Sequence, residues 1–336
     1  MSQTQITSFA TPEGAATSPV AQDFHRLQEH LNQRIIGQPL LTEGLLLAIL
    51  ADGHLLVEGA PGLAKTKAIK ELSLAVEGSE HRIQFTPDLL PADLTGTEIY
   101  HPEDGSFRFQ QGPVFHNFVL ADEINRAPAK VQSALLEAMA ERQVTVGSET
   151  HQLPKIFLVM ATQNPIEQEG TYPLPEAQLD RFLLHLRIGP PDAASELKIL
   201  QLVRAEAQEM PVEPFRPITQ ASVLAARQEA LGVHLSPALE NYLVQLVVAS
   251  REPAAYDADL ARWIEWGASP RGSIALDRCS RARAWLRGRS FVTPEDIQAV
   301  APDVLNHRVL PSYEAEATGV TASKIVERIL QLVPLP

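Results

Sequence analysis

The chain has 336 residues, of which 45% are hydrophobic, so it can bury one large core or two modest ones. Its formal net charge is -13, from 28 basic and 41 acidic residues, and this field repels nucleic-acid phosphates and anionic lipid. Cys279 is the single cysteine, which excludes an internal disulfide and argues against a thiolate metal site. These numbers favour a protein of the reducing cytoplasm that does not bind nucleic acid.

The N-terminal residues 1–21 lack the basic and apolar segments of a signal peptide, and we expect them to form a flexible tail. The apolar run at residues 40–59 is interrupted by Thr42, Glu43 and Asp52. It falls short of the roughly 20 apolar residues that a membrane-spanning helix needs. We therefore expect no membrane insertion.

Globular patterning begins near Gln22, with a helix predicted to Asn32 and a second, apolar helix after "IIGQ" at residues 35–38. A buried strand follows as "HLLVEG", and it leads directly into "GAPGLAKT" at residues 59–66. The next residues have the length and periodicity of a helix. Strand, glycine-bearing loop and helix therefore occur in the order that a phosphate-binding site needs.

The loop "GAPGLAKT" departs from the usual phosphate-loop pattern because Ala64 stands where the second glycine is expected. Gly59 and Gly62 permit tight turns that point backbone N–H groups at phosphate oxygens. Lys65 would contact the β- and γ-phosphates, and Thr66 would offer a hydroxyl to Mg²⁺. Ala is tolerated at a helix entry with a negative φ, so we predict a helical, negative φ for Ala64. By itself the pattern also fits an ordinary turn before a helix.

The next strand is predicted at residues 81–86, and two hairpin inserts follow, near 97–110 and 144–153. Between them, residues 117–121 form a continuous apolar run typical of a central parallel strand, which ends at Asp122 and Glu123. Two carboxylates at a buried strand end are costly unless something positive lies nearby. Asp122 would hold the Mg²⁺ shell, and Glu123 would orient and deprotonate the attacking water. The alternative is a strand that merely ends at the surface.

Three further polar residues could act at the same phosphate-binding site. Asn164 in "ATQNP" ends the next strand, and ligands of doubly wound sheets bind outside the carboxyl ends of strands. It could hold the lytic water or touch the γ-phosphate. Arg181 in "QLDRF" and Arg271 in "SPRG" could supply the positive charge that phosphoryl transfer needs, a charge that can also be donated from outside the subunit, and Arg271 could instead bind phosphate from the lid side. Each arginine taken singly could be an ordinary surface residue.

Alternating strands and helices up to Gly189 predict an α/β core, residues 22–190, built on a doubly wound, mostly parallel sheet. After "GPPD" the pattern changes to helices. Thr293, Pro294 and Asp296 have the spacing of a capping box that opens one of them. We therefore expect residues 191–336 to form a smaller, all-helical lid domain, with a hinge near residues 189–191.

The order of "GAPGLAKT", "FVLADEINRAP", "ATQNP", "LPEAQLDRF" and "GASPRG" resembles the MoxR family of AAA+ ATPases, over roughly residues 22–333. The resemblance implies ATP and Mg²⁺ bound between neighbours of a homo-oligomeric ring, usually a hexamer, with catalysis that waits for the neighbour's arginine. The site residues that it implies are Ile36 and Gly37 near the adenine, Gly59, Ala60, Pro61, Gly62, Leu63, Ala64, Lys65 and Thr66 around the phosphates, Thr66 and Asp122 at Mg²⁺, and Glu123, Asn164, Arg181 and Arg271 in catalysis.

The resemblance also implies chaperone-like remodelling, maturation or metal insertion of client proteins, commonly with a partner that carries a von Willebrand factor A domain. The hairpins would correspond to inserts that face the ring's pore or a partner, and residues 307–317, "HRVLPSYEAEA", to the family's C-terminal segment, with no role beyond lid packing. The alternatives are a chelatase motor that feeds metal into a tetrapyrrole, a nucleic-acid motor, and a non-enzymatic scaffold. The acidic turn of the first hairpin, with Glu103 and Asp104, argues against a nucleic-acid motor.

Overall fold

The computed structural model describes residues 18–165, 170–208 and 215–336. Residues 1–17 of the expected tail lie outside this range. The first helix, α1 (Pro19–Arg34), begins at Pro19 rather than near Gln22. The Ser18 side chain accepts a hydrogen bond from the Ala21 N–H at 3.1 Å, and proline occupies the first turn. The end of the expected tail is therefore helical.

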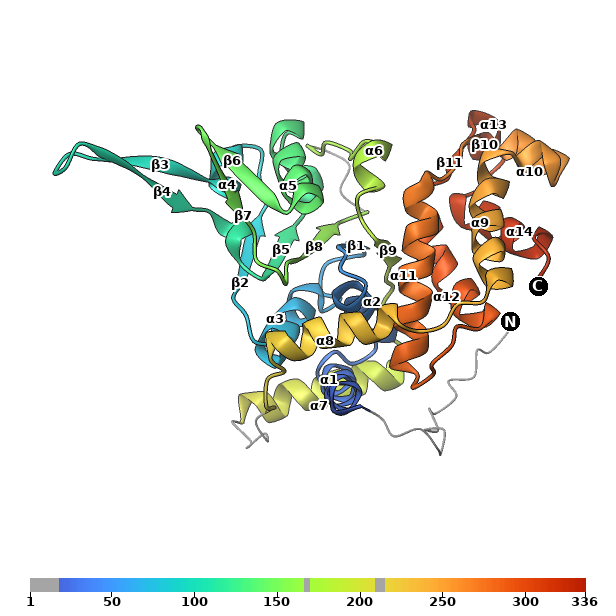
Figure 1. The fold of residues 1–336 in the computed structure, drawn as a ribbon, viewed down its shortest axis with the longest axis horizontal. Helices are drawn as coiled ribbons and strands as arrows, with labels where there is room; N and C mark the ends of the chain where they lie inside the picture. Colours follow the sequence, from blue (N-terminus) through green and yellow to red (C-terminus); the bar gives the residue numbers. More distant parts are fainter. Residues whose placement is uncertain (1–17, 166–169, 209–214) are drawn as a thin grey trace.

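The core is a five-stranded sheet with the strand order β2-β5-β8-β1-β9 (Figure 1). Its strands are β1 (Leu55–Glu58), β2 (Glu80–Gln84), β5 (Phe118–Asp122), β8 (Leu158–Gln163) and β9 (Leu184–Arg187). Every neighbouring pair in the sheet is parallel. The predicted α/β fold with a parallel, doubly wound sheet is confirmed.

Helices cover both faces of this sheet (Figure 1). One face packs on α2 (Pro39–Leu50) and α3 (Lys65–Ala75), with α1 against these two helices, and the other face packs on α4 (Pro91–Thr95) and α5 (Ala129–Glu141). Successive strand residues alternate between the two faces. In β5, for example, Leu120 belongs to the first apolar cluster and Val119 to the second. This two-sided burial explains why the central strands are continuously apolar.

Two antiparallel hairpins project from the core at the positions the sequence predicted. The first pairs β3 (Gly96–His101) with β4 (Ser106–Gln111), and the second pairs β6 (Gln143–Val146) with β7 (Glu149–Gln152). Figure 1 shows the β3–β4 ribbon extending far from the sheet. Along it, the exposed rings of Tyr100 and Phe107 face each other across the strands with centroids 5.2 Å apart.

The C-terminal part is a helical lid. It contains α9 (Pro237–Arg251), α10 (Ala258–Trp263), α11 (Pro270–Leu286), α12 (Pro294–Leu305), α13 (Tyr313–Ala317) and α14 (Ala322–Leu332). The predicted capping box at the start of α12 is present, and buried Asp296 pairs there with Arg283 at 2.7 Å and Arg289 at 2.6 Å. One small antiparallel pair, β10 (Ile264–Trp266) with β11 (Leu310–Pro311), was not expected, because strands of three and two residues leave no periodic signal.

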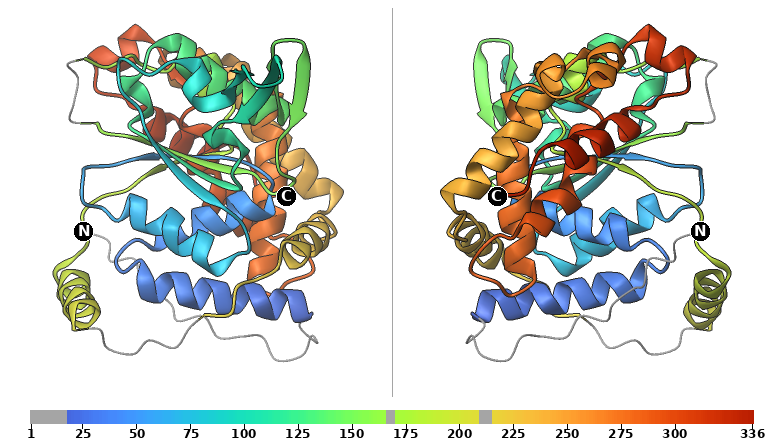
Figure 2. Two further views of the ribbon diagram at one scale, coloured as in Figure 1. Left: turned by 90° about the vertical axis from the view of Figure 1, so that its left-hand side faces the viewer. Right: turned by 90° about the vertical axis from the view of Figure 1, so that its right-hand side faces the viewer.

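Two helices that follow residue 190 contact the α/β core. Helix α8 (Gln220–Leu231) packs against α1 and α2 of the core as well as α11 of the lid, and its Arg227 Nε donates to the Ile49 carbonyl at 2.7 Å. Helix α7 (Ala193–Ala207) contains no buried residue and lies apart at the edge of the molecule (Figure 2). Its Glu206 pairs with Lys67 at 3.0 Å and Arg34 at 2.9 Å. The division at residue 190 therefore does not coincide with a packing boundary.

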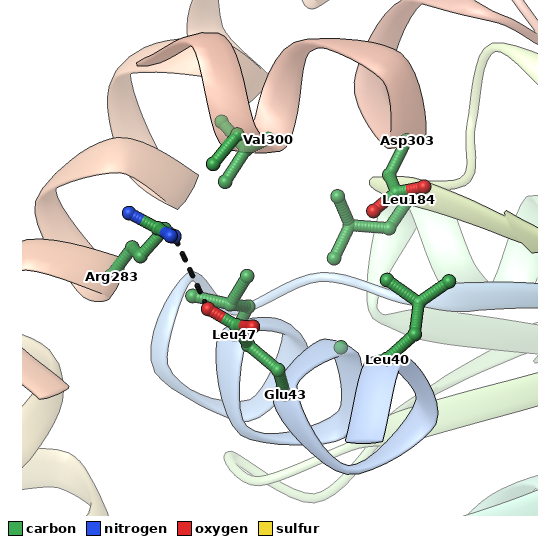
Figure 3. A pocket seen from close by; sticks show the side chains of 9 residues that line it. Leu40, Glu43, Leu47, Leu184, Arg283, Val300 and Asp303 are labelled. Atoms are coloured by element: carbon green, nitrogen blue, oxygen red, sulfur yellow. Dashed lines mark hydrogen bonds and ion pairs between the residues drawn. The ribbon is translucent and has the colours of Figure 1, made fainter. Parts of the chain in front are cut away.

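Core and lid meet at a small pocket of about 50 Å³ between α2, α11 and α12. Figure 3 shows Glu43 of α2 joined to Arg283 of α11 on one side and Asp303 of α12 on the other; Arg283 Nε lies 3.2 Å from Glu43 Oε1. Burial, and secondarily the Glu43 carboxylate, raises the pKa of Asp303 from 3.8 to about 7. Within the described residues, no helix is long and apolar enough to span a membrane.

Candidate functional site

The phosphate loop connects the carboxyl end of β1 to the first residue of α3, Lys65. Gly62 has a φ of +85° and nothing within 4 Å of the place where a Cβ would lie. Ala64 has φ 58° and ψ 17°, which is left-handed, so the predicted negative φ is wrong. The loop makes a left-handed turn just before the helix, and the Ala64 carbonyl still accepts the first helical bond, from Ala68 N–H at 2.9 Å. Left-handed backbone next to a helix N-terminus turns N–H groups toward one centre, which suits an anion.

Lys65 reaches back across the loop. Its ammonium donates to the carbonyl of Gly59 and, at 3.3 Å, to that of Ala60. Burial lowers the pKa of Lys65, while the nearby Asp122 and Glu123 carboxylates oppose this effect. The cation therefore lies within the influence of both acids at the end of β5.

Asp122 is buried, and its carboxylate accepts three hydrogen bonds, one fewer than its roughly four acceptor sites. Its Oδ2 accepts from Arg82 Nη2 at 2.7 Å, and its Oδ1 accepts from Thr162 Oγ1 at 2.6 Å. Arg82 lies on β2 and Thr162 on β8, the two strands that flank β5. A carboxylate with an oxygen available to a hard cation at a strand end fits the oxygen-ligand chemistry of Mg²⁺, with the Thr66 hydroxyl as its natural companion.

Glu123 directly follows β5 with a left-handed φ of 56°. Its N–H donates to Thr162 Oγ1 at 2.9 Å, and its Oε2 accepts from Gln84 Nε2 at 2.8 Å. Arg126 Nε is 3.2 Å from the same oxygen. These contacts fix the direction of the Glu123 carboxylate at the carboxyl end of the sheet, as a general base requires.

Sequence reasoning missed four side chains that contact these acids. The missed residues are Arg82, Gln84, Arg126 and Thr162. A usable signal was the alternation in β2, which places residues 82 and 84 on the same face of the strand. The register Gln84↔Asp122 then brings that face to the acids.

Asn164 and residues 36–37 also lie at the carboxyl end of the sheet, around the phosphate loop. Asn164 is buried and immediately follows β8, whose Gln163 carbonyl accepts from the Gly59 N–H at 3.2 Å. On the other side of the loop, Gly37 has a φ of +79°, and an added Cβ would come within 2.7 Å of Pro191 Cβ. Partly exposed Ile36 adjoins it, so residues 36–37 and the segment around residue 191 border one side of the site.

The two arginines lie at the opposite end of the sheet. Arg181 precedes β9, which runs parallel to β1, and the Leu183 N–H donates to the His54 carbonyl just before β1. The phosphate loop follows the other end of β1. One four-residue strand, about 13 Å at 3.3 Å per residue, separates the two ends. Arg181 therefore cannot reach a nucleotide bound at the phosphate loop of its own chain.

Arg271 belongs to the same opposite end. Its Nη1 lies 3.6 Å from Asp180 Oδ2, beside Arg181, and its side chain is 54% exposed. The structure places Arg271 next to Arg181 rather than near Lys65 of its own chain, so the expected contact with phosphate from the lid side is not made within one chain. Arg181 Nη1 donates to the Leu136 carbonyl at 2.7 Å, at an open hollow of about 440 Å³ lined partly by Ser133 and Gln178.

Fold and site together define an AAA-type nucleotide-binding protein. Residues 54–184 match the family model "ATPase family associated with various cellular activities (AAA)", and residues 258–329 match "AAA lid domain". Chaperone MoxR1 of Mycobacterium tuberculosis is 42% identical over 343 residues, covering 98% of this chain and 90% of that protein. The chain belongs to the MoxR family of AAA ATPases.

Two other similarities bear on fold and function. The crystal structure of a putative ATPase from Cytophaga hutchinsonii matches with a TM-score of 0.87 and 46% sequence identity, covering 94% of this chain and 96% of that one. The magnesium-chelatase subunit ChlI of Nicotiana tabacum is 29% identical over 256 residues, which is 74% of this chain and 54% of that protein. The predicted resemblance to the MoxR family, and the helical lid after the α/β core, are confirmed.

Proposed function

We propose that this protein hydrolyses ATP at the interfaces of a homo-oligomeric ring and uses the cycle to remodel client proteins. The observation that carries the proposal is the separation of the site into two halves. Lys65, Asp122 and Glu123 lie at the carboxyl end of the sheet, and Arg181 with Arg271 lies at the amino end. A second copy, placed with its amino end against the first copy's carboxyl end, makes one complete site.

The residues at the carboxyl end form the half of the site that binds the nucleotide, which we call the acceptor half, and the two arginines form the donor half. The backbone N–H groups of residues 59–65 and the Lys65 ammonium bind the phosphates, with Lys65 exchanging its carbonyl partners for phosphate oxygens. Thr66 and Asp122 would hold Mg²⁺, which neutralises phosphate charge when bound. Ile36 and Gly37 would contact the adenine.

Glu123 and Asn164 act on the attacking water. Glu123 takes its proton, and Gln84 with Arg126 sets the direction of the carboxylate. Asn164 supplies a neutral amide that orients the water. Arg181 and Arg271, donated by the neighbour, stabilise the negative charge on the γ-phosphoryl group in the transition state.

The remaining assignments follow from the family. We propose a cytoplasmic hexamer whose subunits consist of a core and a lid, acting as a chaperone with a von Willebrand factor A domain partner; the similarity to a protein named a chaperone supports this role. The second candidate is a motor subunit for metal insertion into a tetrapyrrole, favoured by the similarity to ChlI. A nucleic-acid motor has no support, because Glu103 and Asp104 make the tip of the long hairpin acidic.

Phosphate release by the wild type and two variants tests the proposed activity. Glu123→Gln should bind ATP and lower kcat at least about 100-fold, because the general base is lost. Arg181→Ala should also bind ATP and lose about 1,000-fold in kcat, because the donated charge is lost. The matched control is Glu327→Gln on exposed lid surface, which should hydrolyse like the wild type. Equal hydrolysis by wild type and Glu123→Gln would refute the assignment.

A further inference from the structure

The segment that carries Arg181 is held by a buried arginine in the turn that follows the lid helix α12. Arg308 Nε donates to Asp180 Oδ1 at 2.8 Å, and its Nη2 donates to the carbonyls of Phe182 at 2.6 Å and Asp180 at 3.2 Å. Its Nη1 donates to the Leu183 carbonyl at 3.2 Å and to that of Val304. The guanidinium group thus binds the side chain of Asp180 and the backbone carbonyls of residues 180, 182 and 183.

The neighbouring His307 adds a contact to the same segment. A ring nitrogen of His307, Nε2, lies 3.1 Å from the Phe182 carbonyl, and the residue is buried. Residues 307 and 308 are the first two of "HRVLPSYEAEA", the stretch for which the sequence indicated no role beyond lid packing. Their side chains contact the one segment of the core that carries a predicted catalytic arginine.

Asp180 also holds the start of α11. Its Oδ2 accepts from Ser269 Oγ at 2.8 Å and lies 3.6 Å from Arg271 Nη1. Ser269 is the N-cap of α11, and its Oγ accepts from the Arg271 N–H at 3.1 Å. One carboxylate therefore links the backbone next to Arg181 with the helix end that presents Arg271.

The form of these contacts suits positioning better than stability. A buried ion pair adds little net stability, because desolvation offsets the attraction, but it selects one geometry. The arginine donors form a rigid planar fork, so bonds to several backbone carbonyls fix the direction of the chain. Arg308 is 8% exposed, which keeps water from competing for these bonds.

We propose that Asp180 and Arg308 are positioning residues that set the relative placement of Arg181 and Arg271, so that both reach the nucleotide of the next subunit. We call this group, with Ser269, the arginine clasp. The inference rests on the proposed function and adds to it the device that aligns the donor half of the site. Neither residue touches the chain's own phosphate loop, so each acts only in trans.

Asp180→Asn is the first test, because the change keeps the shape and removes the charge. The variant should bind nucleotide with the wild-type Kd, since its own loop is untouched, and lose about 10- to 100-fold in kcat, the effect of misplacing a catalytic group by about 1 Å. Asp277→Asn is the control. Asp277 lies on α11 and, like Asp180, pairs with an arginine, Arg281 at 2.7 Å, but the described contacts do not link it to residues 180–183.

Mixed rings of two variants distinguish a positioning role of Asp180 from a merely structural one. Asp180→Asn subunits keep an intact acceptor half, and Glu123→Gln subunits keep an intact donor half. A mixture should hydrolyse ATP faster than the sum of the two proteins assayed separately. Activity no greater than that sum, or wild-type kcat in Asp180→Asn alone, overturns the clasp.

A second pair of variants keeps the test open if Asp180→Asn does not fold. Ser269→Ala removes the N-cap of α11 together with its bond to Asp180, and Ser236→Ala removes the N-cap of α9, a bond from Leu239 N–H, alone. The two should lose similar stability. Only Ser269→Ala should lower kcat, and equal kcat values in the two would overturn the proposal. If the wild type itself shows no hydrolysis, or Glu123→Gln retains it, the proposed function fails instead.

Discussion

Replacing Asp303 by Asn should stabilise the protein at pH 8 and change its stability little at pH 4. Asp303 lines the pocket between α2 and α12, opposite the Glu43–Arg283 pair (Figure 3). Burial first, and Glu43 second, raises the pKa of its carboxyl to about 7 from an ordinary 3.8. Ionised Asp303 is therefore unfavourable in the folded protein, and the neutral amide of Asn avoids the cost.

The sign and size follow from proton linkage. Below pH 3.8 the carboxyl is protonated in both folded and unfolded chains, so it has no effect on the pH dependence there. Between about pH 4 and pH 7 only the folded state keeps the proton, so the free energy of unfolding falls as the pH rises. Above about pH 7 the loss is complete. At 1.36 kcal/mol per pKa unit, the separation of 3.8 and about 7 corresponds to about 4 kcal/mol at most.

The assay is urea unfolding of wild type and Asp303→Asn at pH 4 and pH 8. We expect a higher midpoint for the variant at pH 8, worth up to about 4 kcal/mol, and nearly equal midpoints at pH 4. Asp259→Asn, on the exposed surface of α10, is the control and should show no such difference between the two pH values. The reasoning fails if Asp303→Asn changes the stability equally at both pH values, or if the variant is less stable than the wild type at pH 8.

Two backbone predictions follow from glycine and alanine positions. Ala64→Gly should raise the free energy of unfolding by about 0.5 to 1 kcal/mol, because relief of a left-handed φ outweighs the added entropy of the unfolded chain; lower stability in urea unfolding would contradict this. Gly96→Ala should lower it by about 2 kcal/mol or more, because φ is +90° and the new Cβ would lie 2.2 Å from the Gln110 carbonyl oxygen. Gly105→Ala, at the open tip of the same hairpin, is its control and should cost less; equal losses by the same assay would argue against the predicted clash.

The acceptor half of the site was predictable because its parts are local. A strand, a glycine-bearing loop and a helix follow one another at Lys65, and an apolar strand ends at Asp122 and Glu123. The partners of these acids were not predictable in the same way. Arg82 and Thr162 meet Asp122 only because β2 and β8 flank β5, and strand order is not contained in any single stretch.

Other misses have equally physical causes. The negative φ predicted for Ala64 considered the helix that follows and neglected the turn that precedes it, where the loop is left-handed. The location of Arg271 depends on the orientation of the whole lid, which is set by contacts between residues far apart in the chain, such as Asp180 and Arg308. The start of α1 depended on one capping side chain, Ser18.

The two ends of the parallel sheet give the proposed assembly a polarity. Donor and acceptor surfaces are different, so two copies can associate only head to tail, and no two-fold axis relates them. Such a contact closes on itself if its rotation divides a full turn, and otherwise it winds into an open helical row. In a closed ring every subunit has a complete site. In an open row the last acceptor lacks its arginines, so activity per subunit would report whether the assembly has closed.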